Sequence, residues 1–297
     1  MEAKVGIVLV NYNGEKFQND CIRTIKEMTY RNYEIFVVDN NSKDQSIKTL
    51  KEKYSDVNII ETGENCGVAK GNNIGIKKAL ENGCEYILLL NNDTEVDKEM
   101  LSNLIKKSNK NTLVTCKMYF FNNKEKIWCA GGKIDWSKAT TVHFGENEID
   151  DGSNDRSRYV EYTPTCCLLI HKGVFENIGL MDEKYFMYYD DADFVVRANK
   201  VGYKVWYESN AKLWHKVSSS SGGSESKIIL YYANRNRLYF INKFYKSKLR
   251  VLIYYYLTRI TKCIKYSFVS RELAKIIIKS IYDYKNDRMY LQNLNNK

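Results

Sequence analysis

Apolar runs and amphipathic stretches alternate regularly along the first hundred residues of the chain. The runs are almost continuous in hydrophobic residues, as in parallel strands that helices cover on both faces. The stretches between them repeat their apolar positions at helical spacing. Four strands are predicted, VGIVLVN, YEIFVVDN, VNIIETG and YILLLNND, separated by three helices, FQNDCIRTIKEM, DQSIKTLKEKY and AKGNNIGIKKALENG. This alternation indicates an α/β domain with a parallel sheet.

The pattern changes after about residue 110. Further strands are predicted at TLVTCKMYF, KIWCAGGKIDW, RYVEYTPTCCLLI and YKVWYESN, with only one clear helix among them, at about 190–200. The remainder of the chain is helical, basic and rich in tyrosine. We therefore expect an α/β domain at 1–224, composed of two halves, followed by a helical extension at 225–297. The two halves are expected at about 1–110 and 111–224.

Composition narrows the class of protein. Of the 297 residues, 44% are hydrophobic and 28% charged, which is a globular balance and excludes a disordered chain. The net charge of +10 suits an anionic partner, such as nucleic acid, an acidic membrane face or a phosphate-bearing ligand, although biased composition explains it equally well. The N-terminus does not resemble a signal peptide, and no apolar run reaches the roughly 18 residues that span a bilayer. The eight cysteines show no zinc-binding spacing, so we expect reduced thiols and a cytoplasmic protein.

Polar side chains directly follow three of the predicted strands. The three tips are Asn11-Tyr12-Asn13, Asp39-Asn40-Asn41 and Asn91-Asn92-Asp93. Ligands of open α/β sheets bind at the carboxyl ends of parallel strands. Turn chemistry alone favours Asn and Asp, so one such tip means little, whereas three on one edge indicate a site. Tyr12 beside Asp39 suits a nucleobase. Asp93 suits a divalent metal that bridges phosphates, since the glycine-rich phosphate-binding motifs are absent.

Two further groups of residues lie in the second half. Asp190, Asp191 and Asp193 crowd the start of a predicted helix, among the aromatic residues of YFMYYDDADF. A charged helix cap explains one of these acids, whereas acids among aromatic rings fit a sugar site with a general base. His215 follows a strand and precedes SSSSGG at 218–223, a segment that suits a lid. A lone histidine is more often structural than a ligand.

The chain resembles the inverting family-two glycosyltransferases of GT-A fold, and among them the bacterial rhamnosyltransferase-like branch. The matching segments occur in the family's order: VLVNYNG, FVVDNNSKD, ENCGVAKGNNIGI, YILLLNNDTEV, CCLLIHKGVFENIGLMDEKYFMYYDDADFVVRANKVGYKV and AKLWHKVSSSSGG. They cover about residues 1–240, and the ordered set is far more specific than any single segment. The resemblance implies a mixed, mostly parallel sheet flanked by helices, the nucleotide-diphospho-sugar transferase fold, with a C-terminal helical extension.

The resemblance also implies roles for single residues. Asp93 falls on the metal-binding position of the family's D-x-D motif, and His215 on a metal-ligating histidine of several members, so Mn²⁺ or Mg²⁺ is the expected cofactor. Asp191 falls on the catalytic base, with Asp190 as the second choice because the family has Glu-Asp at this pair. Asn91 and Asn92 replace acidic positions, so low metal affinity is expected without nucleotide. Donor binding is expected from Asn11, Tyr12, Asn13, Asp39, Asn41, Lys70, Asn72, Asn92, Asp93 and Arg235.

The expected reaction is transfer of a sugar from a nucleotide-diphosphate donor to a hydroxyl of a cell-surface polysaccharide or lipid-linked glycan. The branch implies rhamnose from dTDP-rhamnose, with a UDP-hexose or galactofuranose as alternatives. Two other functions compete. A sugar-nucleotide nucleotidyltransferase would usually carry a glycine-rich loop after the first strand, and NYNGEKF has one glycine. A nucleic-acid-binding protein would rely on the basic tail and would lose affinity steeply with salt; we do not expect this partner.

The basic tail from residue 248 onward leaves two interpretations open. KLRVLIYYYLTRITKCIKYSF places Lys and Arg around aromatic residues, which suits peripheral contact with the anionic inner face of the cell membrane. The alternative is a pair of helices packed on the catalytic domain or on a second copy in a homodimer. Packing is favoured.

Overall fold

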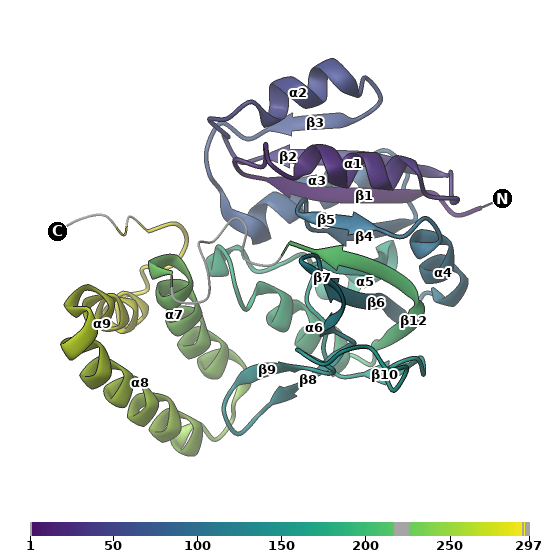
Figure 1. Ribbon diagram of the computed structural model, residues 1–297. Helices are drawn as coiled ribbons and strands as arrows, with labels where there is room; N and C mark the ends of the chain where they lie inside the picture. Colours follow the sequence, from purple (N-terminus) through teal and green to yellow (C-terminus); the bar gives the residue numbers. More distant parts are fainter. Residues whose placement is uncertain (1, 217–225, 293, 295–297) are drawn as a thin grey trace.

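The centre of the molecule is a mixed sheet, which has ten strands in the described part of the chain (Figure 1). The structure is a computed structural model, and it describes residues 2–216, 226–292 and 294. The first half supplies four mutually parallel strands, β1 Val5–Asn11, β2 Tyr33–Asp39, β3 Asn58–Glu61 and β4 Tyr86–Leu90. The helices between them are α1 Gln18–Lys26, α2 Ser46–Lys53 and α3 Gly67–Glu81. These elements confirm the predicted alternation.

The second half extends the same sheet with antiparallel as well as parallel pairs, so the sheet is mixed as predicted. Along its main path the strand order is β10-β12-β6-β11-β4-β1-β2-β3. The added strands are β5 Thr94–Val96, β6 Thr112–Phe120, β7 Asn123–Cys129, β10 Arg158–Val160, β11 Cys167–His171 and β12 Lys204–His215, and a separate two-stranded sheet consists of β8 Gly132–Asp135 and β9 Thr140–His143. The helices are α4 Met100–Lys107, α5 Lys172–Ile178, the short 3-10 helix η1 Glu183–Tyr185, and α6 Asp190–Lys200.

Three expectations for the second half need correction. RYVEYTPTCCLLI is not one strand, because residues 161–166 separate β10 from β11. The single helix expected there has a companion, α5, whose seven residues are too few to show a helical period and which buries Val174 and Phe175. KIWCAGGKIDW is not one strand, because Gly131 adopts a φ of 75° between β7 and β8. That left-handed conformation breaks a strand and favours glycine.

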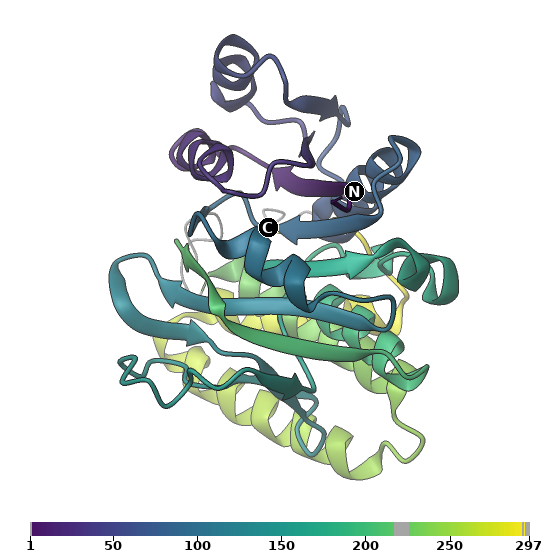
Figure 2. The same ribbon diagram turned by 90° about the vertical axis from the view of Figure 1, so that its right-hand side faces the viewer.

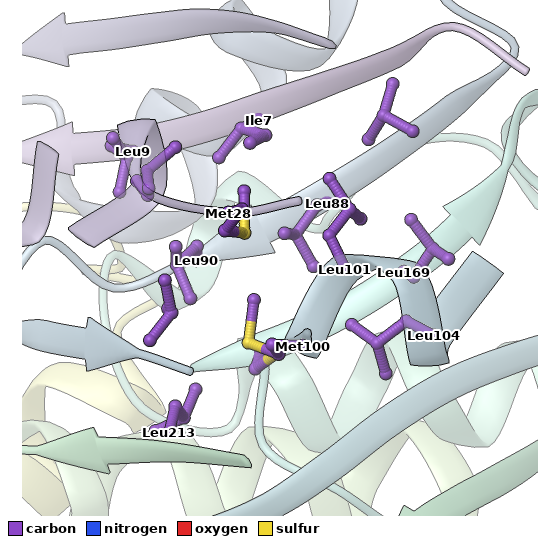
Figure 3. Packing of buried hydrophobic residues seen from close by; sticks show 14 of the residues in the cluster. Ile7, Leu9, Met28, Leu88, Leu90, Met100, Leu101, Leu104, Leu169 and Leu213 are labelled. Atoms are coloured by element: carbon purple, nitrogen blue, oxygen red, sulfur yellow. The ribbon is translucent and has the colours of Figure 1, made fainter. Parts of the chain in front are cut away.

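The alternation of side chains along each strand divides the core between the two faces of the sheet. On β1, Ile7 and Leu9 point into one cluster with Leu88, Leu90 and residues of α4, shown in Figure 3. Val8 points to the other face. Each large side chain buried in this way contributes about 1.5–3 kcal/mol. The two clusters fix the register of the strands, and through it the position of every strand tip.

Three further helices follow, α7 Lys227–Phe244, α8 Leu249–Val269 and α9 Arg271–Lys285. They lie beside the second half of the molecule, at the end away from α1 and α2 (Figures 1 and 2). Apolar residues of α7, α8 and α9 share two buried clusters with residues of α6 and of the segment before it. None of the helices in the described ranges is long and apolar enough to cross a membrane. All eight cysteines are described, and all are free thiols.

Candidate functional site

Asn11 ties the tips of three strands into one edge. Its Nδ2 lies 2.9 Å from Asp39 Oδ1, 3.0 Å from Ser42 Oγ and 3.0 Å from Ser46 Oγ, and these acceptors share its two hydrogens. Its Oδ1 accepts a hydrogen bond from Asn92 Nδ2 at 2.9 Å. The parallel register places Asn11 directly beside Asp39. Because Asn11 is fully buried, its side chain positions Asp39 and Asn92 rather than facing solvent.

The outer part of this edge is open. Tyr12 is 47% exposed and lies at the end of β1. Asn13 and Asn41 adopt left-handed backbone conformations, with φ of 53° and 62°, which asparagine tolerates better than most residues. Both asparagine Oδ1 atoms accept hydrogen bonds from Lys43, Asn13 from its backbone N–H and Asn41 from its Nζ. The loops after β1 and β2 therefore hold each other, with the Tyr12 ring exposed next to them.

The start of α3 adjoins the same edge, because Asn40 Nδ2 donates to the carbonyl of Gly67 at 3.0 Å. Two predicted donor ligands lie on this helix. Lys70 forms an exposed ion pair with Glu64 at 2.8 Å, and Asn72 is buried. The structure therefore places both on the helix that borders the edge, and within the described residues neither side chain forms a hydrogen bond or ion pair with the strand tips.

Asp93 and His215 meet at the end of β4, although 122 positions separate them in sequence. The antiparallel pairing of β12 with β5 sets His215 opposite Thr94. His215 Nε2 then lies 3.1 Å from Asp93 Oδ1, and both side chains are buried. Asn91 Nδ2 lies 3.4 Å from the same ring nitrogen. The SSSSGG segment that follows, expected as a lid, lies outside the described residues.

The donor set of this pair fits a divalent cation. A carboxylate oxygen and an imidazole nitrogen are ligands that Mn²⁺ accepts, and Mg²⁺ favours the oxygen. No group of three or more His, Cys, Asp or Glu side chains is arranged for a metal within the described ranges. Within the described residues, the chain offers two candidate ligands at this point, Asp93 and His215.

The three acids at the start of α6 have different environments. Asp193 is fully buried and is neutralised by Arg197 Nε at 2.7 Å and Lys243 Nζ at 2.6 Å, so its role is structural. Asp190 is also buried, and burial together with the charge of Asp191 raises its pKa well above the usual range. Asp191 is partly exposed. It is the one of the three acids that is partly exposed, and it forms no ion pair within the described residues.

Asp191 is held in a fixed orientation. Tyr162 donates its hydroxyl proton to Asp191 Oδ2, and the backbone N–H of Ala192 lies 2.7 Å from Oδ1. Burial raises the pKa of Asp191, and the Tyr162 hydrogen bond opposes part of that increase. A carboxylate with a raised pKa binds a proton more strongly than an ordinary aspartate.

A row of rings joins the Asp93–His215 pair to Asp191. The rings of His215 and Trp128 lie 4.5 Å apart, those of Trp128 and His143 5.0 Å, and those of His143 and Tyr162 6.0 Å. Tyr162 in turn contacts Asp191. Burial lowers the pKa of His143, which favours its neutral form. The two chemical groups thus lie at the ends of one continuous wall.

Sequence reasoning missed the middle of this wall. Trp128, His143 and Tyr162 come from β7, β9 and the residues after β10. None of them follows a parallel strand or belongs to a motif of the resemblance. The one available signal was that His143 is among only three histidines in the chain.

The segment before α6 has an unusual backbone. Phe186, Tyr188 and Tyr189 have φ of 65°, 63° and 69°, a region that bulky residues rarely adopt. Asn236 of α7 is fully buried, and its Nδ2 lies 2.8, 2.7 and 2.9 Å from the carbonyl oxygens of Tyr185, Met187 and Tyr188. The C-terminal helices therefore hold the strained backbone that leads into Asp190 and Asp191.

Arg235 is not placed at the strand edge, which corrects the donor-binding role expected from the sequence. Arg235 lies on α7, and its side chain is fully buried between this helix and the residues after α9. Its guanidinium donates to the carbonyl oxygens of Tyr185 at 3.1 Å and Tyr290 at 2.8 Å, and its Nε to Asn236 Oδ1 at 3.0 Å. The sequence does not predict this burial, because basic residues on a helix normally lie at the surface.

A cavity of about 620 Å³ lies at the other end of α6, beside Trp136, Asn199 and Lys204. Val196 of α6, Phe144 and Glu161 also line it, whereas neither Asp191 nor any residue of the strand tips does so. The cavity therefore borders the segments that carry His143 and Tyr162 and lies apart from the strand edge.

The mixed sheet with its flanking helices has the GT-A fold, which is the fold of nucleotide-diphospho-sugar transferases. Solved structures share this fold. They include the mannosyltransferase PcManGT from Pyrobaculum calidifontis in complex with GDP-Man and Mn²⁺, with a TM-score of 0.58 and 13% identity over 96% of this chain and 76% of that chain. S. aureus TarS 1-349 has a TM-score of 0.57 and 14% identity over 95% and 80%. At such identities the likeness concerns the fold alone.

Sequence comparisons show which family and which relatives the chain is similar to. Residues 6–138 match the model of Glycosyl transferase family 2. The dTDP-rhamnosyl transferase RfbF of Shigella flexneri is 28% identical over 226 residues, which are 74% of this chain and 72% of that protein. The low-salt glycan biosynthesis hexosyltransferase Agl10 of Haloferax volcanii is 26% identical, with coverage of 82% and 78%. Residues 6–138 are thus similar to glycosyl transferase family 2, and the named relatives are glycosyltransferases that include a dTDP-rhamnosyl transferase, so the chain is a glycosyltransferase and the resemblance is confirmed.

Proposed function

We propose that the enzyme moves a sugar from a nucleotide-diphosphate donor to an acceptor hydroxyl by a single inverting displacement, with Asp191 as the general base. The observation that carries this proposal is the row of rings between the Asp93–His215 pair and Asp191. A donor whose diphosphate lies at one end of that wall would present its anomeric carbon toward the other end. The acceptor hydroxyl would then enter beside Asp191.

Asp93 and His215 are the residues that would hold a divalent ion, Mn²⁺ or Mg²⁺. When bound, such an ion offsets the charge that develops on the leaving diphosphate. Two structural neighbours, PcManGT and GalNAc-T7, are described with Mn²⁺ and a nucleotide or nucleotide sugar, which supports a divalent ion here. With only two side-chain ligands, we expect the ion to bind together with the donor.

Asp191 is better suited to take the proton than its two neighbours. Asp191 is partly exposed, whereas Asp190 is buried and Asp193 is paired with two cations. The raised pKa of Asp191 brings its proton affinity closer to that needed at neutral pH. The hydrogen bonds from Tyr162 to Oδ2 and from the Ala192 N–H to Oδ1 hold the carboxylate in place, and a remaining lone pair would accept the acceptor proton. General-base assistance of this kind contributes roughly 10²–10⁴ in rate.

The nucleoside would bind at the strand edge. Tyr12 offers an exposed ring face for the base, and Asp39 and Asn92 are held in position by Asn11. Asn13, Asn41, Lys70 and Asn72 border this edge and complete the proposed donor site. Rhamnose carried on dTDP is our first choice of donor because the relative RfbF is named as a dTDP-rhamnosyl transferase. A UDP-sugar is the alternative.

The acceptor that we propose is a growing polysaccharide or a lipid-linked glycan. One relative, from Mycobacterium tuberculosis, is named N-acetylglucosaminyl-diphospho-decaprenol L-rhamnosyltransferase and is 20% identical over 73% of this chain. A lipid-linked acceptor would require the enzyme to reach a membrane surface.

We further propose that α8 supplies this peripheral membrane contact. Six apolar residues recur every three or four positions along one face of α8, and each is at least half exposed: Leu249, Ile253, Leu257, Ile260, Ile264 and Phe268. At 1.5 Å per residue this stripe is about 28 Å long. An exposed apolar surface of this kind is unusual for a free protein surface.

The charge around the stripe favours an anionic lipid surface over a second copy of the chain. The segment 245–271 contains seven Lys or Arg residues and no Asp or Glu. Two copies that met through this face would bring like charges together. An anionic leaflet would instead attract the segment by about 1 kcal/mol per basic residue near the surface.

The transfer reaction can be tested with Asp191→Asn. Candidate donors, dTDP- and UDP-sugars, are first screened by thermal shift with and without Mn²⁺. The variant should keep the melting shift of the wild-type protein and lose transfer by a factor of about 10² or more. NMR of the product should show an inverted anomeric configuration. Full transfer by Asp191→Asn, or retention of configuration, would exclude this mechanism.

A further inference from the structure

A second group of basic residues lies close to Asp191, apart from the strand edge. Arg237 of α7 and Arg259 and Lys262 of α8 line a cavity of about 190 Å³. Tyr189, the residue directly before Asp190 and Asp191, lines it from the other side. The cavity therefore opens next to the segment that carries the proposed base.

The two arginines of this cavity are not neutralised within the described part of the chain. No carboxylate there lies within 4.0 Å of a guanidinium nitrogen of Arg237 or Arg259; the ion pairs of the structure involve other residues. Arg237 donates to the carbonyl of Lys138, and Arg259 Nη1 to Asn234 Oδ1. Arg259 Nε is buried and has no hydrogen-bond partner in the same ranges.

This arrangement leaves a buried donor of Arg259 without a hydrogen-bond partner, beside the charge of Arg237. Burial and the nearby charge of Arg237 both lower the pKa of Arg259, which reports an unfavourable environment for its charge. A buried donor without a partner is rare and calls for an explanation. Guanidinium groups bind phosphate oxygens through paired N–H donors. The cavity is also several times the roughly 30 Å³ that one water molecule occupies in the liquid.

We propose that this cavity binds a phosphate or diphosphate group of the acceptor substrate, at a site separate from that of the donor diphosphate. The assignment to the acceptor rests on the proposed function, in which the acceptor enters beside Asp191. The donor diphosphate would lie instead at Asp93 and His215, at the far end of the wall of rings. An acceptor anchored by its phosphate would present its sugar hydroxyl to the base.

Binding can be measured without transfer, so a failure of this proposal is distinguishable from a failure of the proposed function. Calorimetric titration in EDTA, which removes metal-bridged binding at Asp93, uses inorganic pyrophosphate and geranyl diphosphate as probes, with geraniol as the phosphate-free control. The wild-type protein should bind both phosphate probes with a salt-sensitive affinity and should not bind geraniol. Arg259→Met should weaken this binding at least about ten-fold, as expected for a lost charge-assisted hydrogen bond.

Two more variants keep the test decisive. Ala233→Glu, on the α7 wall of the cavity, would place a carboxylate beside the arginines, so it should abolish probe binding while leaving the melting temperature unchanged or higher. Lys275→Met removes one exposed positive charge of α9 and should bind the probes like the wild-type protein. Equal affinities in all four proteins would overturn the proposal. So would an equal loss of dTDP binding in Mn²⁺ by Arg259→Met, which would assign the cavity to the donor.

Discussion

Replacing Asn236 by Leu should separate catalysis from donor binding. The two side chains have nearly the same shape, but Leu cannot donate a hydrogen bond. Asn236 Nδ2 contacts the carbonyl oxygens of Tyr185, Met187 and Tyr188. These carbonyls belong to the segment that enters α6 at Asp190 and Asp191. The substitution therefore acts on the position of the base without touching the strand edge.

The size of the effect follows from the hydrogen bonds and the strain. The Tyr185 carbonyl keeps a second donor, Arg235 Nη2 at 3.1 Å, so at most two carbonyls lose theirs, at roughly 1–3 kcal/mol each. Arg235 Nε also loses its acceptor, Asn236 Oδ1, which adds to the destabilisation. Phe186, Tyr188 and Tyr189 store roughly 1–3 kcal/mol each in left-handed backbone. The hydrogen bonds of Asn236 to the carbonyl oxygens hold the segment in this strained conformation. Losing up to about 6 kcal/mol of this stabilisation lets the segment relax to a less strained backbone.

The expected result is a fall in kcat of about ten- to a hundred-fold, since a misplacement of about 1 Å has that effect on a reacting group. The KM for the donor and the Mn²⁺-dependent melting shift with dTDP should stay unchanged. The pH profile of kcat should also move, because Asp191 enters a different environment. Steady-state kinetics over a pH series measures kcat, the donor KM and the pH profile. Thermal-shift measurements give the melting shift.

Destabilisation alone must not produce the same result. Leu104→Ala removes a fully buried side chain of α4 and should destabilise the protein by about 2–5 kcal/mol with kcat unchanged. The positioning role of α7 would be refuted if Asn236→Leu kept kcat within two-fold of the wild-type value. It would also be refuted if Asn236→Leu raised the donor KM by as much as the control variant Leu104→Ala does.

Three further outcomes are expected. Asp93→Ala should lose the Mn²⁺-dependent melting shift given by nucleotide sugar, which for the wild-type protein at 100 times Kd corresponds to about 2.7 kcal/mol and several degrees; an unchanged shift would remove Asp93 from the metal site. Asp190 has a raised pKa in the folded protein, so the folded state binds a proton that the unfolded state releases, and stability falls as pH rises from about 4 through that pKa. Asp190→Asn should therefore be more stable than the wild-type protein at pH 7, and this difference should vanish near pH 4. Denaturant titrations at both pH values measure the difference. The double variant Leu257→Glu, Ile264→Glu should no longer sediment with vesicles that contain anionic phosphatidylglycerol. The control Ile149→Glu, a change at an exposed residue outside α8, should still do so. Persistent binding of the double variant, or a change only in its oligomeric state, would refute the proposed membrane contact.

The sequence predicted those parts of the molecule in which local pattern and tertiary position agree. The parallel strands of the first half are buried on both faces, so each is a continuous apolar run whose end marks the ligand edge. That is why Asp39 and Asp93 could be placed at one edge before the fold was known. Asp93 and His215 were assigned separately, and the pairing of β12 with β5 brings them within 3.1 Å.

The rest of the site depends on packing between segments with no shared pattern. Trp128 and His143 lie on β7 and β9 and Tyr162 follows β10, and an aromatic residue in such a segment looks like any other strand residue. Only the arrangement of β7, β9 and the segment after β10 puts their rings in one row. Their sequence neighbours carried no indication of it.

Arg235 and Asn236 show why the C-terminal helices cannot be treated as an addition to a complete enzyme. Taken by its sequence, α7 is a basic helix, and basic residues normally lie at the surface. Here the charge and amides of α7 are buried because the segment 184–190 supplies backbone carbonyls that have no partner of their own in a helix or sheet. The strained segment and α7 therefore require each other: the left-handed residues persist because α7 binds their carbonyls, and the buried polar groups of α7 are satisfied by that backbone. The position of Asp191 therefore depends on both the strained segment and α7, and it cannot be predicted from the sequence of either one alone.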